Sequence, residues 1–184
     1  IALYARATNK DGGGTRIDFT PERDRQVAAV TGQNQLIRVK VSGGAAVEIK
    51  SPRLGRAGDL VAAVAGVIKQ SGRAERVLVS SFDPVALVQL YRHLPDVAVA
   101  HLFHDQQSLA LRRGWAGHLV GASLVHPQHT LVDAASLARW HRVGFAVNVW
   151  TVNDDAELRR LAALGVDGVF ADDPGHALAV LAGE

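Results

Sequence analysis

From residue 46 onward, short apolar runs alternate with longer stretches in which apolar positions recur every three or four residues. The apolar runs predict strands at 46–50, 76–82, 97–103, 118–125, 145–152 and 168–172. The periodic stretches predict helices at 57–71, 83–94, 105–113, 133–143, 154–164 and 174–183. Strands that are apolar at nearly every position are typical of a parallel sheet covered on both faces. The pattern therefore predicts consecutive strand–helix units.

Three of these helices begin at a clear capping signal. Asp83-Pro84 and Asp173-Pro174 each place a capping aspartate before a proline in the first helical turn. Asp154 and Asp155 precede the stretch AELRRLAAL, and Gly165 follows it, where a left-handed conformation commonly ends a helix. The starts of these helices are therefore well marked.

Repeated strand–helix units fit either a doubly wound sheet or most of an eight-fold α/β barrel. No G-x-G-x-x-G motif follows a predicted strand, which weakens the dinucleotide-binding alternative. Residues 1–45 differ from the rest: 1–7 and 36–44 resemble strands, but 15–33 is polar and poorly periodic, and no clear helix is visible. A barrel would therefore be short at its N-terminal end.

Composition narrows the class of protein. Hydrophobic residues make up 48% of the chain and charged residues 21%, which is typical of a globular protein. The net charge is +2 with no run of Lys and Arg, so nucleic-acid binding has little support. No apolar run approaches the ~20 residues of a transmembrane helix. The absence of cysteine excludes disulfides, thiolate metal sites and a cysteine nucleophile.

The chain contains no methionine and begins at Ile1 inside a strand-like segment. We therefore expect a fragment, a processed form or the ordered part of something longer. No signal peptide is visible, but this means little if the N-terminus is missing. The compartment stays unknown, with the cytoplasm slightly favoured over export.

Polar and aromatic residues gather where the predicted strands end. They are Glu48, Lys50, Ser81, Phe82, His101, His126, Trp150, Asp172 and Asp173. In a parallel barrel the active site forms at these carboxyl ends. This set would suit a metal-assisted reaction on an anionic substrate: carboxylates would hold a hard cation, a lysine would neutralise a phosphate, and aromatics would wall an apolar or sugar-like group.

Each candidate also has a purely structural interpretation. Glu48 and Lys50 lie two apart on a strand, so they share a face and could pair inside a barrel. Trp150 and Phe82 could be core residues. His126 and His129 flank a Pro-Gln pair and are interpreted as solvated loop residues, and Asp172 with Asp173 as a helix cap and its neighbour. The segment 9–14 (NKDGGG) is interpreted as a turn.

Three stretches of the chain resemble, in this order, the later two-thirds of the glycerophosphodiester phosphodiesterase family. They are "VEIKSP", "VLVSSFDPVALVQLYRHLPDVAVAHLF" and "GFAVNVWTVNDDAELRRLAALGVDGVFADDP". The resemblance covers 46–184 and leaves 1–45 divergent. It implies a single α/β domain over 1–184, a (β/α)8 TIM-type barrel that is incomplete or degenerate at the N-terminal end. It also implies metal-dependent hydrolysis of glycerophosphodiesters to glycerol 3-phosphate and an alcohol, with Ca²⁺ or Mg²⁺.

The resemblance assigns roles residue by residue. Glu48 matches a metal-ligand glutamate and Lys50 the catalytic lysine that faces the phosphate, while Phe82 and Trp150 match aromatics that line the glycerol end. The family's first strand, with its His-Arg pair, is not found, and the first histidine here is His93. Laid against the family's second strand, Ala2 and Tyr4 stand where two metal carboxylates belong.

These departures leave three functional hypotheses. The first is a metal-dependent phosphodiester hydrolase, with the activity of this chain left open. The second is a non-catalytic barrel that binds a phosphate ligand or a partner. The third is a homo-oligomer in which another chain completes the barrel, because open strand edges invite pairing.

Overall fold

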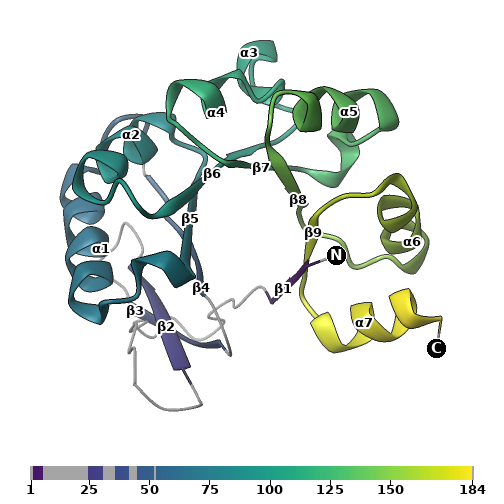
Figure 1. The fold of residues 1–184 in the computed structure, drawn as a ribbon, viewed down its shortest axis with the longest axis horizontal. Coiled ribbons are helices and arrows are strands. Elements are labelled where there is room, and N and C mark those ends of the chain that lie inside the picture. Colours follow the sequence, from purple (N-terminus) through teal and green to yellow (C-terminus); the bar gives the residue numbers. More distant parts are fainter. Residues whose placement is uncertain (1, 6–24, 31–35, 42–44, 52, 184) are drawn as a thin grey trace.

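The computed structural model describes residues 2–5, 25–30, 36–41, 45–51 and 53–183. Within them, seven parallel strands form one sheet in the order β1-β9-β8-β7-β6-β5-β4. Their bounds are β1 Ala2–Ala5, β4 Ala45–Glu48, β5 Val77–Ser81, β6 Ala98–Phe103, β7 Leu124–Pro127, β8 Ala146–Val149 and β9 Gly168–Ala171. Figure 1 shows that this sheet curls into an arc with its helices on the outside.

The helices follow the strands in the alternation that the sequence predicts. They are α1 Gly58–Ser71, α2 Pro84–His93, α3 Leu109–Arg112, α4 Trp115–Leu119, α5 Ala134–Arg142, α6 Asp155–Leu164 and α7 Pro174–Ala182, with short 3-10 turns at Ala74–Arg76 and His129–Leu131. A curled parallel sheet wrapped by helices is part of a TIM-type barrel. The predicted fold class, an incomplete α/β barrel, is confirmed.

Two apolar clusters hold the helices against the convex face of the sheet. One joins β4, β5 and β6 to α1 and α2, with Val79, Ile68 and Leu87 fully buried at its centre. The other joins β6 to β9 with α5, α6 and α7 around Trp140 and Leu158. Because successive strand residues point to opposite faces, the residues between these core positions face the inside of the arc.

The predicted helix caps are confirmed. The side chains of Asp83, Asp154 and Asp173 each accept a hydrogen bond from a backbone N–H in the first turn of α2, α6 and α7. Gly165 ends α6 with a φ of 88°, a left-handed conformation that glycine adopts without steric cost.

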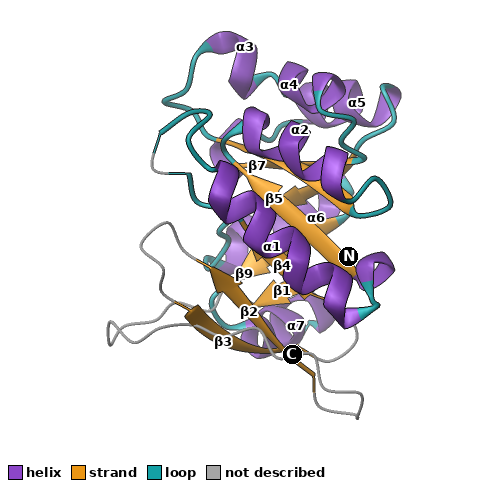
Figure 2. Ribbon diagram, turned by 90° about the vertical axis from the view of Figure 1, so that its left-hand side faces the viewer, coloured by secondary structure: helices purple, strands orange, loops and turns teal. Residues whose placement is uncertain are grey.

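The N-terminal part contributes three strands among the described residues. β2 (Arg25–Val30) and β3 (Leu36–Val41) form an antiparallel hairpin, and β2 contacts β4 and α1 (Figure 2). β3 matches a predicted strand, whereas β2 falls in a stretch that was interpreted as polar and poorly periodic. The turn predicted at 9–14 lies outside the described residues.

β1 pairs in parallel with β9, with Ala2 opposite Gly168 and Tyr4 opposite Phe170. The strand beside the last strand of a closed barrel is its first strand. In a chain without the family's first strand, the second strand would be the next neighbour available to β9, so the alignment of Ala2 and Tyr4 to second-strand positions stays a prediction.

Two predicted elements between β6 and β7 differ from the structure. The strand predicted at 118–125 is wrong in its first half, because 118–119 end α4 and β7 begins only at Leu124. Gly117 lets α4 lie close to Phe145, since a Cβ there would come within 3.0 Å of that ring, and Gly121 turns the chain with a φ of 68°. The helix predicted at 105–113 is confined to α3. A helix end and a glycine turn therefore lie where the apolar run predicted a strand.

Candidate active site

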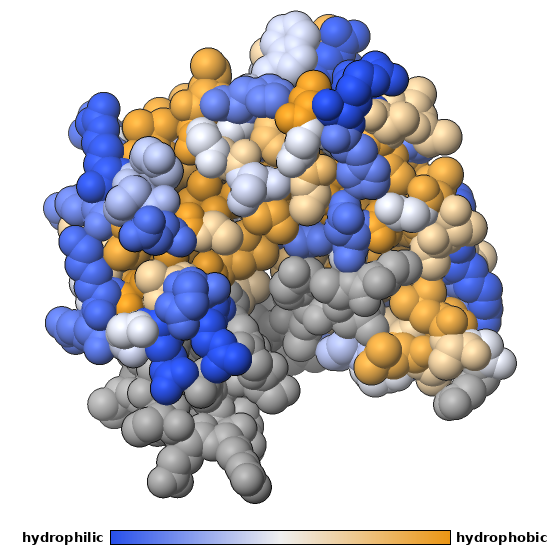
Figure 3. Space-filling model, viewed as in Figure 1, coloured by the Kyte–Doolittle hydropathy of each residue, from blue (hydrophilic) through white to orange (hydrophobic). Residues whose placement is uncertain are grey.

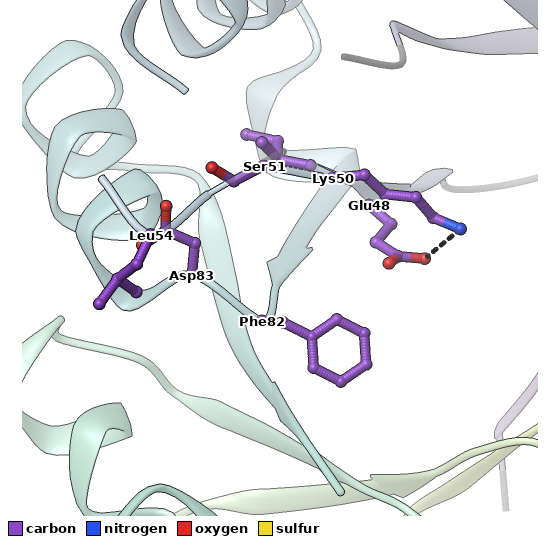
Figure 4. A pocket seen from close by; sticks show the side chains of 7 residues that line it. Glu48, Lys50, Ser51, Leu54, Phe82 and Asp83 are labelled. Carbon is purple, nitrogen blue, oxygen red and sulfur yellow. Dashed lines mark ion pairs between the residues drawn. The ribbon is translucent and has the colours of Figure 1, made fainter. Parts of the chain in front are cut away.

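A cavity of about 370 Å³ opens where β4 and β5 end. It is lined by Glu48, Ile49, Lys50, Ser51, Leu54, Phe82 and Asp83 (Figure 4). The two strands are parallel neighbours with Glu48 opposite Ser80, so the residues after each strand reach the same edge. Three of the four predicted site residues, Glu48, Lys50 and Phe82, therefore share one cavity.

Glu48 and Lys50 form an ion pair, with 3.8 Å between Lys50 Nζ and Glu48 Oε2 (Figure 4). The lysine side chain is 59% exposed and the glutamate 35%. A pair this open to water contributes only about 0–1 kcal/mol of stability. The pair is therefore not a buried structural salt bridge, and little free energy opposes a rearrangement of Lys50 toward an anionic ligand.

Trp150, the fourth predicted residue, joins the cavity through Phe82. The two rings meet edge to face, with centroids 5.4 Å apart and an angle of 86°. A hydrogen bond orients the indole, because Trp150 Nε1 donates to the carbonyl of His126 at 2.6 Å. Phe82 therefore connects the ion pair on one side to an oriented tryptophan on the other.

His104 is a further residue of this aromatic wall that was not predicted. Its ring lies 5.6 Å from Phe82 at an angle of 64°. The backbone N–H of Gln106 points at His104 Nδ1 at 3.2 Å, which places the ring proton of the neutral form on Nε2. A signal existed: Phe82 directly follows β5 and His104 directly follows β6, so the two hold equivalent positions.

The segment after β4 is tied to the start of α2 by Asp83. One carboxylate oxygen accepts from Val85 N–H at 2.9 Å and the other from Gly55 N–H at 2.7 Å. Ser81 reinforces the corner, since its hydroxyl donates to the carbonyl of Ile49 and accepts from Asp83 N–H. Ser81, a candidate for chemistry at the strand end, is fully buried and structural.

Replacing Asp83 with alanine should therefore lower the free energy of unfolding by more than the loss of a helix cap alone, because the bond to Gly55 is lost as well. Asp173 begins α7 with the same Asp-Pro sequence, is exposed, and caps one N–H, that of His176. We expect Asp173→Ala to lower the free energy of unfolding by about 1 kcal/mol and Asp83→Ala by about 2–3 kcal/mol. Urea unfolding of both variants measures the difference, and equal losses would show that the Gly55 bond contributes nothing.

His101 and His126 lie away from the cavity, inside the protein. Both are 0% exposed, so the interpretation of His126 as a solvated loop residue is wrong. Its strand, β7, is covered on both faces, and His126 packs against Phe170 with a ring distance of 5.0 Å. Burial lowers the pKa of His101 to about 4 and that of His126 to about 3, where the nearby His101 adds a smaller effect. Both rings are neutral at ordinary pH.

The remaining polar candidates make contacts between neighbouring loops. His129 Nδ1 lies 3.0 Å from a carboxylate oxygen of Glu157. Asp172 accepts a hydrogen bond from Asn153, and Asp173 caps α7, as interpreted from the sequence. These residues connect adjacent strand–helix units rather than the cavity.

The described residues do not by themselves make a divalent-cation site. They contain no group of three or more His, Cys, Asp or Glu side chains placed to hold a metal ion. Of the two carboxylates that line the cavity, Asp83 uses both oxygens for backbone N–H groups, which leaves Glu48. Because Ca²⁺ takes six to eight oxygen ligands and Mg²⁺ six, one carboxylate is not enough.

The fold and the site together define a parallel α/β barrel with a lysine and an aromatic wall at the carboxyl ends of its strands. Residues 22–176 match the glycerophosphoryl diester phosphodiesterase family. The chain belongs to this family, which confirms the resemblance.

Individual relatives agree with this assignment. A glycerophosphodiester phosphodiesterase of Bacillus altitudinis is 27% identical over 113 residues, covering 58% of this chain and 43% of that protein. A crystal structure from Silicibacter pomeroyi, described as a glycerophosphoryl diester phosphodiesterase, is 28% identical with a TM-score of 0.67 and covers 75% of this chain and 50% of that one. The chain thus spans about half the length of these relatives.

A third relative shows the fold alone. The phosphodiesterase of Oleispira antarctica, solved in complex with the product sn-glycerol-3-phosphate, has a TM-score of 0.66 at 24% identity, over 76% of this chain and 55% of that one. In the part of this chain that the structure covers, no helix is long and apolar enough to cross a membrane.

Proposed function

We propose that this chain carries the phosphate-binding half of a glycerophosphodiester phosphodiesterase site. The observation that carries the proposal is the convergence of Lys50, Glu48 and Phe82 on one cavity, with Trp150 packed against Phe82. The parent reaction is hydrolysis: water adds to phosphorus, the bond to the alcohol oxygen breaks, and the alcohol takes up a proton. The products are glycerol 3-phosphate and the free alcohol.

Lys50 binds the phosphodiester anion in this proposal. Its side chain is 59% exposed and its 3.8 Å ion pair with Glu48 is open to water, so the ammonium can turn to a phosphate oxygen without breaking a buried salt bridge. An ammonium is a compact charge with three donors, which suits a tetrahedral phosphate. The same charge stabilises the negative charge that gathers on the phosphoryl oxygens as water adds.

Phe82 and Trp150 form the wall for the glycerol end of the substrate. Their edge-to-face contact presents one ring face and one ring edge to a ligand, which suits the carbon chain of glycerol. His104 extends this wall, and its Nε2–H is a donor for a hydroxyl or phosphodiester oxygen.

Glu48 is the proposed ligand for Ca²⁺ or Mg²⁺. A bound cation would supply charge neutralisation at the phosphoryl oxygens. Since the described residues offer it one suitable carboxylate, the roles assigned to Lys50, Phe82 and Trp150 do not depend on it.

Calorimetric titration of glycerol 3-phosphate tests the phosphate site. We expect Lys50→Ala to weaken binding about 10–100-fold, because a charged hydrogen bond is lost. Lys69→Ala is the matched control, since Lys69 is an exposed lysine on α1, outside the cavity. If the two variants bind equally well, the phosphate site is elsewhere.

A non-catalytic phosphate-binding barrel is the second candidate. It is favoured because, among the described residues that line the cavity, Glu48 is the one carboxylate besides the helix-capping Asp83. Glycerophosphocholine hydrolysis with Ca²⁺ or Mg²⁺ separates the two candidates. Turnover that falls in Glu48→Gln supports the hydrolase, whereas binding of glycerol 3-phosphate without turnover supports the binding barrel. An oligomer completed by a second chain predicts a mass above the monomer in sedimentation, and a clean monomer at high concentration argues against it.

A further inference from the structure

A second surface with unusual chemistry lies on α3 and α4. Three large apolar side chains are exposed there, Leu109 by 49%, Trp115 by 55% and Leu119 by 83%. Two arginines, Arg112 and Arg113, sit between them in the sequence. We call these five residues the α3–α4 ridge. Trp115 and Leu119 are four residues apart on one helix, so they share a face.

The fold holds Trp115 outward. Gly114 adopts a φ of 77°, and a Cβ at this position would lie 3.1 Å from Nε1 of Trp140. The buried indole of Trp140 donates a hydrogen bond of 3.0 Å to the carbonyl of Arg113. The backbone on the N-terminal side of Trp115 is therefore fixed to α5, and the exposure of this ring is a property of a rigid turn.

The ridge is positively charged. From residue 106 to 132 the sequence has no Asp or Glu, while it contains both arginines. The Arg113 guanidinium lies 5.8 Å from the centre of the Trp115 ring, a cation–π contact that keeps the charge beside the apolar group. Arg112 donates to the backbone carbonyl of Asp105, and it forms no ion pair with a carboxylate of the residues that the structure describes. In Figure 3, apolar and hydrophilic surface lie side by side above α3 and α4.

We propose that the α3–α4 ridge anchors this protein to the surface of an anionic lipid bilayer. Tryptophan and leucine enter the boundary between headgroups and acyl chains, and arginine pairs with lipid phosphates. The shape of the ridge favours a bilayer over a protein partner. α3 projects from the barrel in both ribbon views (Figures 1 and 2). A convex tip offers little of the roughly 800 Å² per partner that a stable protein interface buries.

The ridge and the cavity lie toward the same edge of the barrel. α3 follows the loop that leaves the carboxyl end of β6, and His104 at the start of that loop touches Phe82. A bilayer held by the ridge therefore lies near the edge at which the proposed phosphodiester site opens. The anchoring itself does not depend on hydrolysis.

Co-sedimentation with vesicles tests the anchor. The full chain is mixed with vesicles of phosphatidylcholine alone, or with roughly a third phosphatidylglycerol. We expect preferential binding to the anionic vesicles that weakens in high salt. The double variant Arg112→Gln/Arg113→Gln should lower the partition coefficient about 20–30-fold, since each arginine near an anionic surface contributes about fivefold.

Trp115→Gln should lower binding about tenfold or more on both kinds of vesicle, because it removes the apolar ring that enters the bilayer. Leu178→Gln is the matched control: Leu178 is an apolar side chain of α7, 58% exposed, and should leave binding unchanged. Thermal unfolding shows that the variants are folded.

Three outcomes overturn the proposal. They are no sedimentation with anionic vesicles, binding that Trp115→Gln leaves intact, and a concentration-dependent dimer in analytical ultracentrifugation that Trp115→Gln abolishes. The third outcome would show that the ridge binds a second copy of the chain.

Discussion

Replacement of Trp140 by alanine is expected to lower the free energy of unfolding by about 3–5 kcal/mol. Trp140 is 2% exposed and packs edge-on against Phe103, with ring centroids 5.6 Å apart. Truncation leaves a cavity between α5 and β6, and it also removes the hydrogen bond from Nε1 to the carbonyl of Arg113. Urea unfolding measures the loss.

A phenylalanine at the same position separates packing from hydrogen bonding. Trp140→Phe keeps most of the apolar contact but leaves the Arg113 carbonyl without this donor, so we expect a loss of about 1–2 kcal/mol. Both variants release the turn that presents Trp115, so vesicle binding should fall in both. Unfolding free energies equal to that of the wild-type protein would contradict the described burial of the indole.

The second large effect is a loss of stability in mild acid. In the unfolded chain, His101 and His126 bind a proton near their ordinary pKa of 6.5, whereas burial lowers the folded-state pKa to about 4 and about 3. Between these values the unfolded state binds more protons, so the free energy of unfolding falls as the pH falls. Above pH 6.5 both histidines are neutral in the folded and the unfolded protein, so they no longer lower the free energy of unfolding. His101 alone accounts for roughly 3 kcal/mol of the loss at low pH.

His101→Leu should reduce the slope of the free energy of unfolding against pH between about pH 6.5 and about pH 4 and leave the share of His126. It should also stabilise the protein at low pH, because neither nitrogen of His101 has a hydrogen-bond partner among the residues that the structure describes. His93→Leu, at an exposed position on α2, is the control and should keep the slope of the wild-type protein. An unchanged slope in His101→Leu would contradict a neutral, buried His101.

Glu157 determines how stability depends on pH in stronger acid. Hydrogen bonds from Arg160 and, to a smaller extent, His129 lower the pKa of Glu157 to about 2. Its folded-state pKa is below the ordinary value of 4.5, so its contribution is lost only as the pH falls from there toward 2. The histidine effect therefore begins at a higher pH and can be measured first.

Local signals in the sequence predicted what depends on local contacts. The Asp-Pro starts of α2 and α7 and the glycine end of α6 are confirmed because each requires only a few neighbouring residues. The segment before β7 failed for the opposite reason: whether 118–125 is strand or helix depends on how closely Gly117 approaches Phe145, a contact between distant parts of the chain.

The site was predicted in part for a similar reason. Glu48, Lys50 and Phe82 follow neighbouring parallel strands, so a correct strand assignment already brings them to one edge. The end of β6 at Phe103 is predicted correctly, but the candidate taken from this strand is His101, two residues before its end, and not His104, which directly follows it. The burial of His126 could not be predicted, since it depends on Phe170 from β9.

The pairing of β1 with β9 has a consequence for the order of folding. Strands β4 to β8 each find a neighbour soon after they are made, but β1 must wait for residues 168–171. At typical translation rates this delay is on the order of ten seconds. During that time β1 lacks the neighbour that it has in this sheet, and such exposed backbone is a site of misassembly with other nascent chains. The synthesis of β9 therefore sets when β1 can be protected.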